Sequence, residues 1–327
     1  MSTGTLERPQ HLVADVGGTH ARFALCRSVA DIGHISMVNS ADFPTLQQAI
    51  RHYLDQLGGP AVDSAVIGIA NPVVGDQVKM TNSPWTFSIE QTRRSLGLRA
   101  LHVINDFTAL ALALPHLDSS ALRQVGGAST GARGAPLGVI GPGTGMGVSG
   151  LIPMPGGGWI PLASEGGHAS FAPADDREAM LWRAAHNEYG HVSTERLVSG
   201  PGLVFMYRAI CEHAGRKPRD YSPADISRLA MADADPDCAA ALDTFCAILG
   251  TAAGNLALIL GARGGMYIGG GIVPKLGDYF PRSPFRRRFE DKGRFSGYLA
   301  AIPVYVIMDD YPALVGAAAY LDTYAHG

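Results

Sequence analysis

The feature that most constrains the fold is a pattern that occurs twice: an apolar strand, a glycine-rich turn that carries a threonine, and a second apolar strand. The first copy spans residues 11–26, with GGT at 17–19, and the second spans 137–152, with GPGTGMG at 141–147. The threonines of the two turns lie 125 positions apart. Two strands joined by a short glycine turn form a hairpin. The repetition predicts two such hairpins and a weak internal duplication.

Both turns are suited to binding an anion. Adjacent glycines let backbone N–H groups approach a phosphate without an intervening Cβ, and Thr19 can add a hydroxyl donor. Asp15 directly precedes the first turn, where it could hold Mg²⁺ through water or orient a phosphate. The alternative is an ordinary Gly-Gly hairpin. Neither turn matches a Walker A loop or a Rossmann fingerprint.

The stretch LHVINDFTALALALP at residues 101–115 places two polar residues between an apolar strand and an apolar helix. In α/β sheets, ligands bind at the carboxyl ends of strands, which is where Asn105 and Asp106 are expected. We hypothesise that Asp106 accepts the proton of a substrate hydroxyl and that Asn105 helps to hold the substrate. The alternative is a helix N-cap, because Asn and Asp are preferred there.

Three later segments carry further polar or glycine-rich signals. SEGGH at 164–168 places Glu165 and His168 on a flexible turn, which suits a polyol ligand or forms an incidental ion pair. No further His or Cys pattern completes a zinc site there. Glu195 is either a ligand or an ordinary surface residue. Three glycines at 269–271 follow a predicted strand and open a predicted helix, an arrangement suited to a nucleoside and its phosphate.

The remaining pattern alternates strands and helices and predicts an α/β protein. Residues 119–136 are rich in Gly, Ala and Ser and are expected to form a loop. Trp85, in the loop at 82–85, is expected in the core, with a ligand wall as the alternative. The arginines at 286–288 are expected on a solvated helix face.

Composition excludes several functional classes. The chain of 327 residues is 46% hydrophobic and 17% charged, with a net charge of −3, so nucleic-acid binding has little support. Its four cysteines show no CxxC spacing, which argues against a zinc ribbon or a redox pair. No secretory signal and no uninterrupted apolar run of membrane-spanning length is evident. A cytoplasmic location is therefore expected.

Taken in order, the motifs of the chain resemble those of the bacterial hexokinase-type glucokinase family, within the actin/hexokinase/Hsp70 superfamily. The resemblance covers nearly the whole chain. It rests on ADVGGT at 14–19, VINDFTA at 103–109, GPGTGMG at 141–147, SEGGH at 164–168, FAP at 171–173, ERLVSGPG at 195–202, GGGIVP at 269–274, FEDKGRF at 289–295 and IPVY at 302–305. His20 departs from the family pattern, which more often has Asn after the threonine. The ROK sugar kinases are a related group whose cysteine-rich zinc motif this chain lacks.

The resemblance implies a two-domain α/β fold of the actin-like ATPase (ribonuclease H-like) type, with an interdomain cleft. The small α/β domain is expected to comprise residues 1–116 plus 309–327, and the large α/β domain residues 117–308. A homodimer is also implied. A sugar-responsive transcriptional regulator is less favoured, because only about ten residues precede the first predicted strand.

The resemblance further implies ATP-dependent phosphorylation of D-glucose at its 6-hydroxyl, with Mg²⁺ and with Asp106 as the catalytic base. A kinase for fructose or mannose, or a non-catalytic sugar-binding protein, remains the alternative. Asp15 is the implied metal residue. The implied sugar contacts are Asn105, Asp106, Glu165, His168 and Glu195, and the implied nucleotide contacts are Ala14, Asp15, Val16, Gly17, Gly18, Thr19, Gly143, Thr144, Gly269, Gly270 and Gly271.

Overall fold

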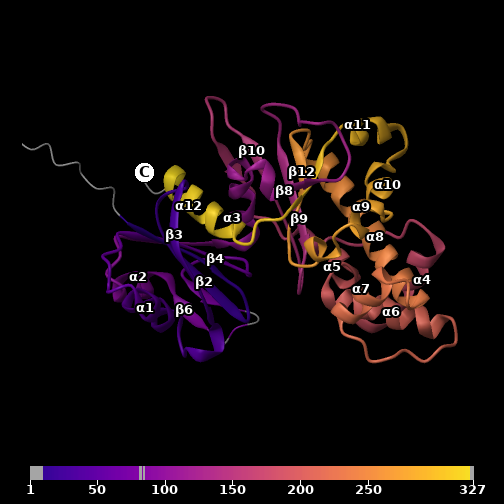
Figure 1. Cartoon of the computed structure of the whole chain (residues 1–327), viewed down its shortest axis with the longest axis horizontal. Helices are drawn as coiled ribbons and strands as arrows, with labels where there is room; N and C mark the ends of the chain where they lie inside the picture. The colour runs from indigo at the N-terminus through magenta and orange to yellow at the C-terminus, as the bar shows by residue number, and fades with distance from the viewer. Residues whose placement is uncertain (1–9, 81–82, 84, 325–327) are drawn as a thin grey trace, which may run out of the picture. The chain divides into compact units, whose positions relative to one another are not determined.

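The computed structural model describes residues 10–80, 83 and 85–324 (Figure 1). The chain divides into two compact units. Unit 1 consists of Met1–Asp118, Gly156–Ala163 and Asp309–Gly327, and unit 2 of Ser119–Pro155 and Ser164–Met308. Of the loop at 82–85 that the sequence predicts, Asn82 and Pro84 lie outside the described residues.

The sheet of unit 1 has the strand order β3-β2-β1-β4-β7. Strand β1 is antiparallel to β2, which is antiparallel to β3, whereas β1, β4 and β7 run parallel to one another. The apolar run of β4 is buried along its whole length, as expected for a parallel strand that is covered on both faces. The strands are β1 (His11–Val16), β2 (His20–Ser28), β3 (Asp31–Asn39), β4 (Ser64–Ile69) and β7 (Ala100–Asn105).

The helices of unit 1 begin where the sequence provides caps. Thr45 caps α1 (Leu46–Gln56) and Ser88 caps α2 (Ile89–Ser95). Each is followed three residues later by a glutamine, the spacing of a capping box, which predicts a helix start. A Cβ on Gly316 would overlap the carbonyl oxygen of Ala109, so glycine lets two helices pack closely here. These helices are α3 (Asp106–Ala113) and α12 (Pro312–Tyr324), and the remaining short strands of unit 1 are β5 (Gln77–Lys79), β6 (Thr86–Ser88) and β11 (Trp159–Pro161).

Trp85 belongs to the core of unit 1, which confirms the first of its two interpretations. Its side chain is 1% exposed and its Nε1–H donates to the carbonyl oxygen of Phe43 at 2.8 Å. A buried indole normally finds such an acceptor. Trp85 therefore packs inside the unit and offers no flat wall to a ligand.

The sheet of unit 2 repeats this plan. Strand β9 is antiparallel to β10 and parallel to β12, which is parallel to β13. The order β10-β9-β12-β13 thus corresponds to β2-β1-β4-β7, in agreement with the predicted duplication. Strand β8, expected as part of a loop, pairs antiparallel with β13. The strands are β8 (Leu122–Gln124), β9 (Leu137–Pro142), β10 (Met146–Pro153), β12 (Gly265–Ile268) and β13 (Val304–Ile307).

Unit 2 also holds most of the helices, with α8 at its centre. This helix continues through Gly250 and Gly254, where the carbonyl groups of Phe285 and Phe289 approach too closely to admit a Cβ. Its most apolar window is 61% buried, the pattern of a core helix. The helices are α4 (Asp176–Tyr189), α5 (Thr194–Leu197), α6 (Gly200–His213), α7 (Pro223–Met231), α8 (Pro236–Leu260), α9 (Tyr279–Arg282), α10 (Phe285–Glu290) and α11 (Ser296–Ala300).

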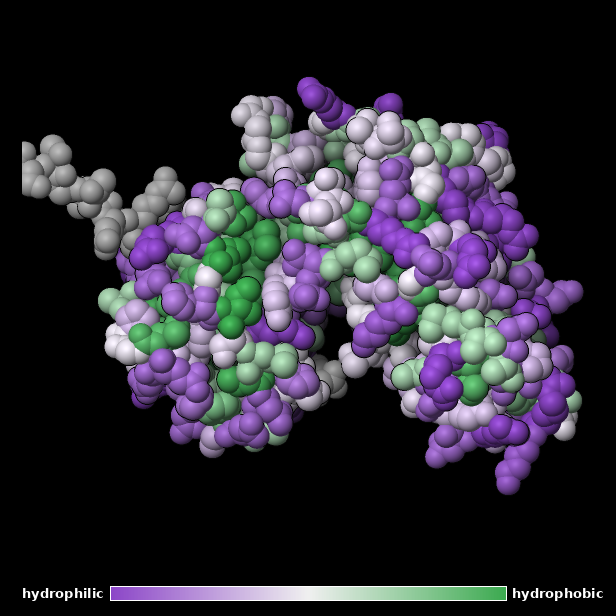
Figure 2. Space-filling model, in the orientation of Figure 1, coloured by the Kyte–Doolittle hydropathy of each residue, from purple (hydrophilic) through white to green (hydrophobic). Residues whose placement is uncertain are grey.

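The surface of unit 2 agrees with helices that are buried on one side only. On the face shown in Figure 2, hydrophilic and apolar side chains are interspersed over α6 and α7. On α7, Ile226 and Ala230 point into the unit. The inward face of α7 is therefore apolar.

The prediction that the arginines at 286–288 lie on a solvated helix face is correct for Arg287, which is exposed, and wrong for Arg286 and Arg288. Arg288 is 8% exposed, and its Nη1 lies 2.7 Å from Oε1 of the buried Glu178. Its Nη2 donates to Oγ1 of Thr251. Arg286 donates to the carbonyl oxygens of Ile302 and Ala300. The guanidinium groups of Arg286 and Arg288 are largely buried because they find acceptors on other elements, which a charge run in the sequence does not reveal.

Candidate active site

Asn105 and Asp106 lie at the junction of β7 and α3, as predicted. The Oδ1 atom of Asn105 accepts from the backbone N–H groups of Phe107 at 2.9 Å and Thr108 at 3.2 Å, so the N-cap interpretation of Asn105 is confirmed. A contact from Asn105 to a ligand would therefore come from its amide nitrogen. Oδ1 of Asp106 accepts from Phe107 N–H at 2.9 Å. A carboxylate at the start of a helix is favoured as an anion.

The strand register brings the first glycine turn to the same edge of the sheet as Asp106. Val16, the last residue of β1, is level with Ile69 of β4, and Ile69 is level with Asn105 of β7. Neighbouring strands are about 4.8 Å apart, so the backbones of Val16 and Asn105 lie roughly 10 Å apart. The turn that follows β1 and the carboxylate that follows β7 therefore share the carboxyl edge of one parallel sheet.

The first turn is anchored within its own hairpin and by Ser40 after β3, whose N–H donates to the Thr19 carbonyl oxygen at 2.8 Å. The N–H of Gly17 donates to the carbonyl oxygen of His20 at 2.9 Å. Asp15 stands opposite Arg22 in the strand pair, and Arg22 Nη1 donates to Asp15 Oδ2 at 3.1 Å. Burial raises the pKa of Asp15, while the Arg22 guanidinium acts in the opposite direction. His20 begins β2 with an exposed side chain, so its departure from the family pattern leaves the hairpin intact.

Asp15 by itself does not form a metal-binding cluster. Within residues 10–80, 83 and 85–324, no group of three or more His, Cys, Asp or Glu side chains could hold an ion, and Asp15 already has Arg22 on one oxygen. Mg²⁺, however, is often bound by one or two carboxylates together with waters and substrate phosphates. The arrangement fits a Mg²⁺ ion that arrives with a nucleotide and reaches Asp15 through water.

The second turn is held by residues distant in sequence. Gly143 N–H donates to the Gly145 carbonyl oxygen at 2.7 Å within the turn. From outside the turn, Gly200 N–H donates to the Gly143 carbonyl oxygen at 2.8 Å, and Glu195 Oε2 accepts from Met146 N–H at 2.8 Å. Glu195 lies in α5 with a side chain 29% exposed. The interpretation of Glu195 as an ordinary surface residue is therefore wrong.

The three glycines at 269–271 lie beside the second turn. They follow β12, whose last residue, Ile268, is level with Ile140 of β9. A Cβ on Gly141 would lie 2.5 Å from the carbonyl carbon of Gly269. Gly270 has a φ of +76°, a left-handed conformation that favours glycine. The predicted nucleoside and phosphate segments are therefore adjacent within unit 2.

Glu165 directly precedes the short 3₁₀ turn Gly166–His168, and His168 is its last residue. The carboxylate nearest to His168 is Glu195, with 3.8 Å between Nδ1 and Oε1, so the predicted pairing of His168 with Glu165 is replaced by one with Glu195. The chain after the turn is fixed by Thr194 N–H, which donates to the Ala169 carbonyl oxygen at 3.0 Å. This contact brings the two segments that carry His168 and Glu195 together.

The sequence did not predict two groups that contact the candidate site residues. Arg22 balances the charge of Asp15, and hairpin register could have revealed it, because the two residues face each other across a short turn. The backbone N–H of Met146 binds Glu195 across 49 positions. No pattern in the sequence predicts a contact between residues so far apart.

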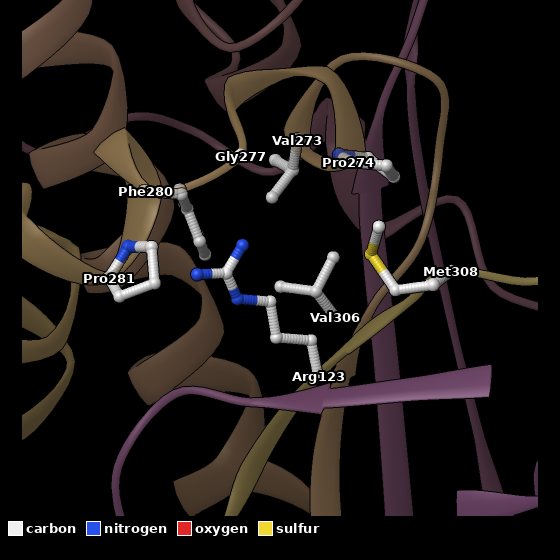
Figure 3. A pocket seen from close by; sticks show the side chains of 8 residues that line it. All are labelled: Arg123, Val273, Pro274, Gly277, Phe280, Pro281, Val306 and Met308. Carbon is white, nitrogen blue, oxygen red and sulfur yellow. The ribbon is translucent and has the colours of Figure 1, made fainter. Parts of the chain in front are cut away.

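A small hollow elsewhere in unit 2 does not serve as the predicted site. Its volume is about 10 Å³, close to the minimum for one water molecule. Figure 3 shows the Arg123 side chain extending into it, and this guanidinium pairs with Asp278 at 2.5 Å. None of the predicted site residues lines it; the lining consists of Arg123, Val273, Pro274, Gly277, Phe280, Pro281, Val306 and Met308.

The strand order of each sheet and the paired glycine-threonine turns define the class of protein as a two-domain actin-like ATPase fold of the sugar-kinase type. The crystal structure of a glucokinase from an Antarctic psychrotroph superposes with a TM-score of 0.86 at 39% identity, covering 96% of this chain and 98% of that one. A ROK family glucokinase from Streptomyces griseus, in complex with glucose and AMPPNP, shares the fold at a TM-score of 0.63 and 20% identity, with 97% and 100% coverage.

Sequence comparison identifies the family. Residues 12–324 match the family model described as Glucokinase. The glucokinase of Chromobacterium violaceum is 57% identical over 321 residues, which cover 98% of this chain and 92% of that protein. The glucokinase of Neisseria meningitidis is 52% identical over 313 residues, which cover 96% and 95%. The chain belongs to the glucokinase family.

Proposed function

We propose that this chain transfers the γ-phosphoryl group of ATP to the 6-hydroxyl of D-glucose, giving glucose 6-phosphate and ADP, with Asp106 as the catalytic base. Membership of the glucokinase family at 52–57% identity supports the reaction. One observation carries the choice of Asp106: its carboxylate follows β7 at the edge of the sheet where the first glycine turn follows β1.

We further propose how the predicted residues divide the work. Glucose is recognised by side chains that offer both acceptors and donors to its hydroxyl groups, which is how a polar site discriminates among sugars. ATP is held by backbone N–H groups of the two turns. The proposed sugar set is Asn105, Asp106, Glu165, His168 and Glu195, and the proposed nucleotide set is Ala14, Asp15, Val16, Gly17, Gly18, Thr19, Gly143, Thr144, Gly269, Gly270 and Gly271.

In the proposed mechanism, Asp106 accepts the 6-hydroxyl proton as the new O–P bond forms and the bond from the γ-phosphorus to the ADP oxygen breaks. Phosphoryl transfer has a loose transition state, so positioning and charge neutralisation dominate. The helix start and Phe107 N–H keep Asp106 anionic, which makes it a modest base that acts late. Asp15, held by Arg22, would contact the Mg²⁺ of the Mg-ATP substrate through water, and the ion would supply neutralisation of phosphate charge.

Asp106→Asn tests the assignment of the base. The variant should fold and bind glucose but lose roughly 10²–10⁴-fold in kcat, measured by ADP release with Mg-ATP and glucose. Asp55→Asn is the matched control, because it removes the same charge from an exposed position on α1. Retention of wild-type kcat by Asp106→Asn would show that Asp106 is not the base.

A panel of hexoses tests the substrate. Turnover with glucose alone is expected. Turnover with fructose or mannose instead of glucose would support the proposed phosphoryl transfer but contradict glucose as the substrate. No turnover with any hexose, from folded protein, would favour a sugar-binding protein without catalysis.

We also propose that the enzyme is a cytoplasmic homodimer. The expectation comes from the family resemblance. Sedimentation velocity at micromolar concentration should give twice the mass of the 34.4 kDa chain; a single species at the monomer mass would contradict the proposal.

A further inference from the structure

Glu195 has a second set of contacts that its proposed role in sugar binding does not require. Its Oε2 accepts the backbone N–H of Met146, at the end of the second glycine turn, at 2.8 Å. Its Oε1 lies 3.8 Å from Nδ1 of His168, on the proposed sugar loop. The two oxygens of one carboxylate therefore face two different ligand-binding segments.

The contact with the turn is close-packed. A Cβ on Gly145 would lie 2.6 Å from Oε2 of Glu195, so the carboxylate rests directly on the backbone of the turn. The only other bond from outside that holds the turn, among the hydrogen bonds described for it, joins Gly200 N–H to the Gly143 carbonyl oxygen. Glu195 and Gly200 lie five positions apart in the sequence, so a single segment of the chain makes both hydrogen bonds to the turn.

The sugar loop packs on the same turn. A Cβ on Gly167 would overlap the carbonyl oxygen of Met146, and a Cβ on Gly166 would lie 2.8 Å from Cγ1 of Val148. Glu195 therefore binds the backbone N–H of Met146, and Gly167 packs against the carbonyl oxygen of the same residue. A displacement of Glu195 would change the turn and the loop together.

We propose that Glu195 couples the binding of sugar and nucleotide: one oxygen orders the second phosphate turn through Met146 N–H, while the other responds to the sugar at His168. The inference rests on the proposed function. A sugar hydroxyl that donates to Oε1 holds the carboxylate in place and so keeps Oε2 on the turn. Linkage then requires each ligand to strengthen the binding of the other by the same factor.

The test measures the Kd of Mg-ADP by calorimetry, without sugar and with saturating glucose. In the wild type, glucose should lower the Kd at least about fivefold. Glu195→Ala should raise the sugar-free Kd about tenfold or more, because a hydrogen bond to a charged group is lost, and should abolish the effect of glucose.

Two further variants separate the roles of the carboxylate. Glu195→Gln retains an oxygen that can accept from Met146 N–H, so its sugar-free Kd should stay within about threefold of the wild type, while its KM for glucose rises. Glu165→Gln is the matched control: it alters the proposed sugar loop without touching the turn. This variant should weaken the binding of glucose and leave the Kd of Mg-ADP measured without sugar unchanged.

Gly145→Ala provides an independent route if Glu195→Ala does not fold. The added methyl group displaces the Glu195 carboxylate from the turn without removing it, and should reproduce the loss of sugar-free affinity. A folded Glu195→Ala or Gly145→Ala protein with wild-type affinity and an unchanged glucose effect would overturn the proposal. Failure of the proposed function differs from this outcome, because wild-type protein would then bind Mg-ADP and yet phosphorylate no glucose.

Discussion

The two glycine-threonine hairpins have the same strand directions but different anchors. In the hairpin of β1 and β2, the ion pair between Asp15 and Arg22 joins residues seven positions apart. In the hairpin of β9 and β10, the carboxylate of Glu195 reaches Met146 across 49 positions. The first turn is stabilised by its own strands and by Ser40, directly after β3, whose N–H donates to the Thr19 carbonyl oxygen at 2.8 Å. The second is held by segments that arrive about 50 or more positions later.

This difference shows how one local motif can serve two purposes. A locally anchored turn forms with its neighbouring strands, so its geometry does not depend on the proposed sugar-binding segments. A turn anchored by distant segments can adopt its binding geometry only when those segments are in place. The second hairpin is therefore the one suited to respond to a ligand at His168 and Glu195, the proposed sugar contacts.

The largest effect on stability is expected when the distant anchoring is broken sterically. In Gly167→Ala, the new methyl group overlaps the Met146 carbonyl oxygen. The backbone must move, because a carbonyl in a strand cannot rotate away. Overpacking of this kind costs about 1–3 kcal/mol, which urea denaturation should detect as a lower midpoint.

Gly17→Ala is the matched change in the first turn. Its methyl group would lie 3.5 Å from the His20 carbonyl oxygen, an ordinary contact. The free energy of unfolding should change by no more than about 1 kcal/mol, since the loss of chain freedom in the unfolded state offsets minor crowding. Equal destabilisation by both substitutions would remove the distinction between the two turns.

The local anchor is expected to give the next largest effect. Arg22→Gln leaves the Asp15 carboxylate partly buried without its cation. Losing one partner of a fully buried pair costs 3–5 kcal/mol, and the partial exposure of both side chains reduces this to roughly 1–2 kcal/mol. Urea denaturation at neutral pH should measure the loss.

The pH dependence of Arg22→Gln follows from the pKa of Asp15. Burial raises that pKa in the folded state, and Arg22 opposes the rise, so the variant should raise it further. A raised carboxyl pKa means that the folded state binds more protons than the unfolded state, and stability falls as pH rises above 3.8. The variant should therefore approach wild-type stability at acid pH and differ most at neutral pH; a constant difference would contradict this account.

Much of the fold could be predicted because its signals are local. Thr45 and Ser88 cap helices as their spacing indicates, and both glycine turns join antiparallel strands. Strand β8 escaped prediction because its three residues are ordered by pairing with β13, which lies far along the chain. The burial of Arg288 depends in the same way on Glu178.

The candidate site likewise has features that local sequence predicts and features that it does not. Motif order predicts which residue types stand in the site, and register explains why Asp106 and the first turn share an edge. The partner of His168 and the bond from Glu195 to Met146 arise from tertiary packing. Contacts of that kind follow from where separate segments meet, which no spacing within one motif specifies.

The smallest effect is expected from an ion pair that touches neither hairpin. On α2, Glu90 accepts from Arg93 and Arg94, and these hydrogen bonds, with Arg93 the larger cause, lower the pKa of Glu90 to about 2. A lowered carboxyl pKa stabilises the folded state above the ordinary value of 4.5, and this stabilisation is lost as pH falls from there towards about 2.

Glu90→Gln should barely change the unfolding midpoint at neutral pH, because exposed pairs contribute little. Its stability should fall less steeply than that of the wild type between pH 4.5 and 2, since Gln does not titrate; urea denaturation at pH 7 and pH 3 measures both. This variant sets the baseline for Arg22→Gln. If Glu90→Gln destabilised the protein at neutral pH as much as Arg22→Gln does, the Asp15–Arg22 pair would be an ordinary surface contact, and the first turn would lack the local anchor that distinguishes it from the second.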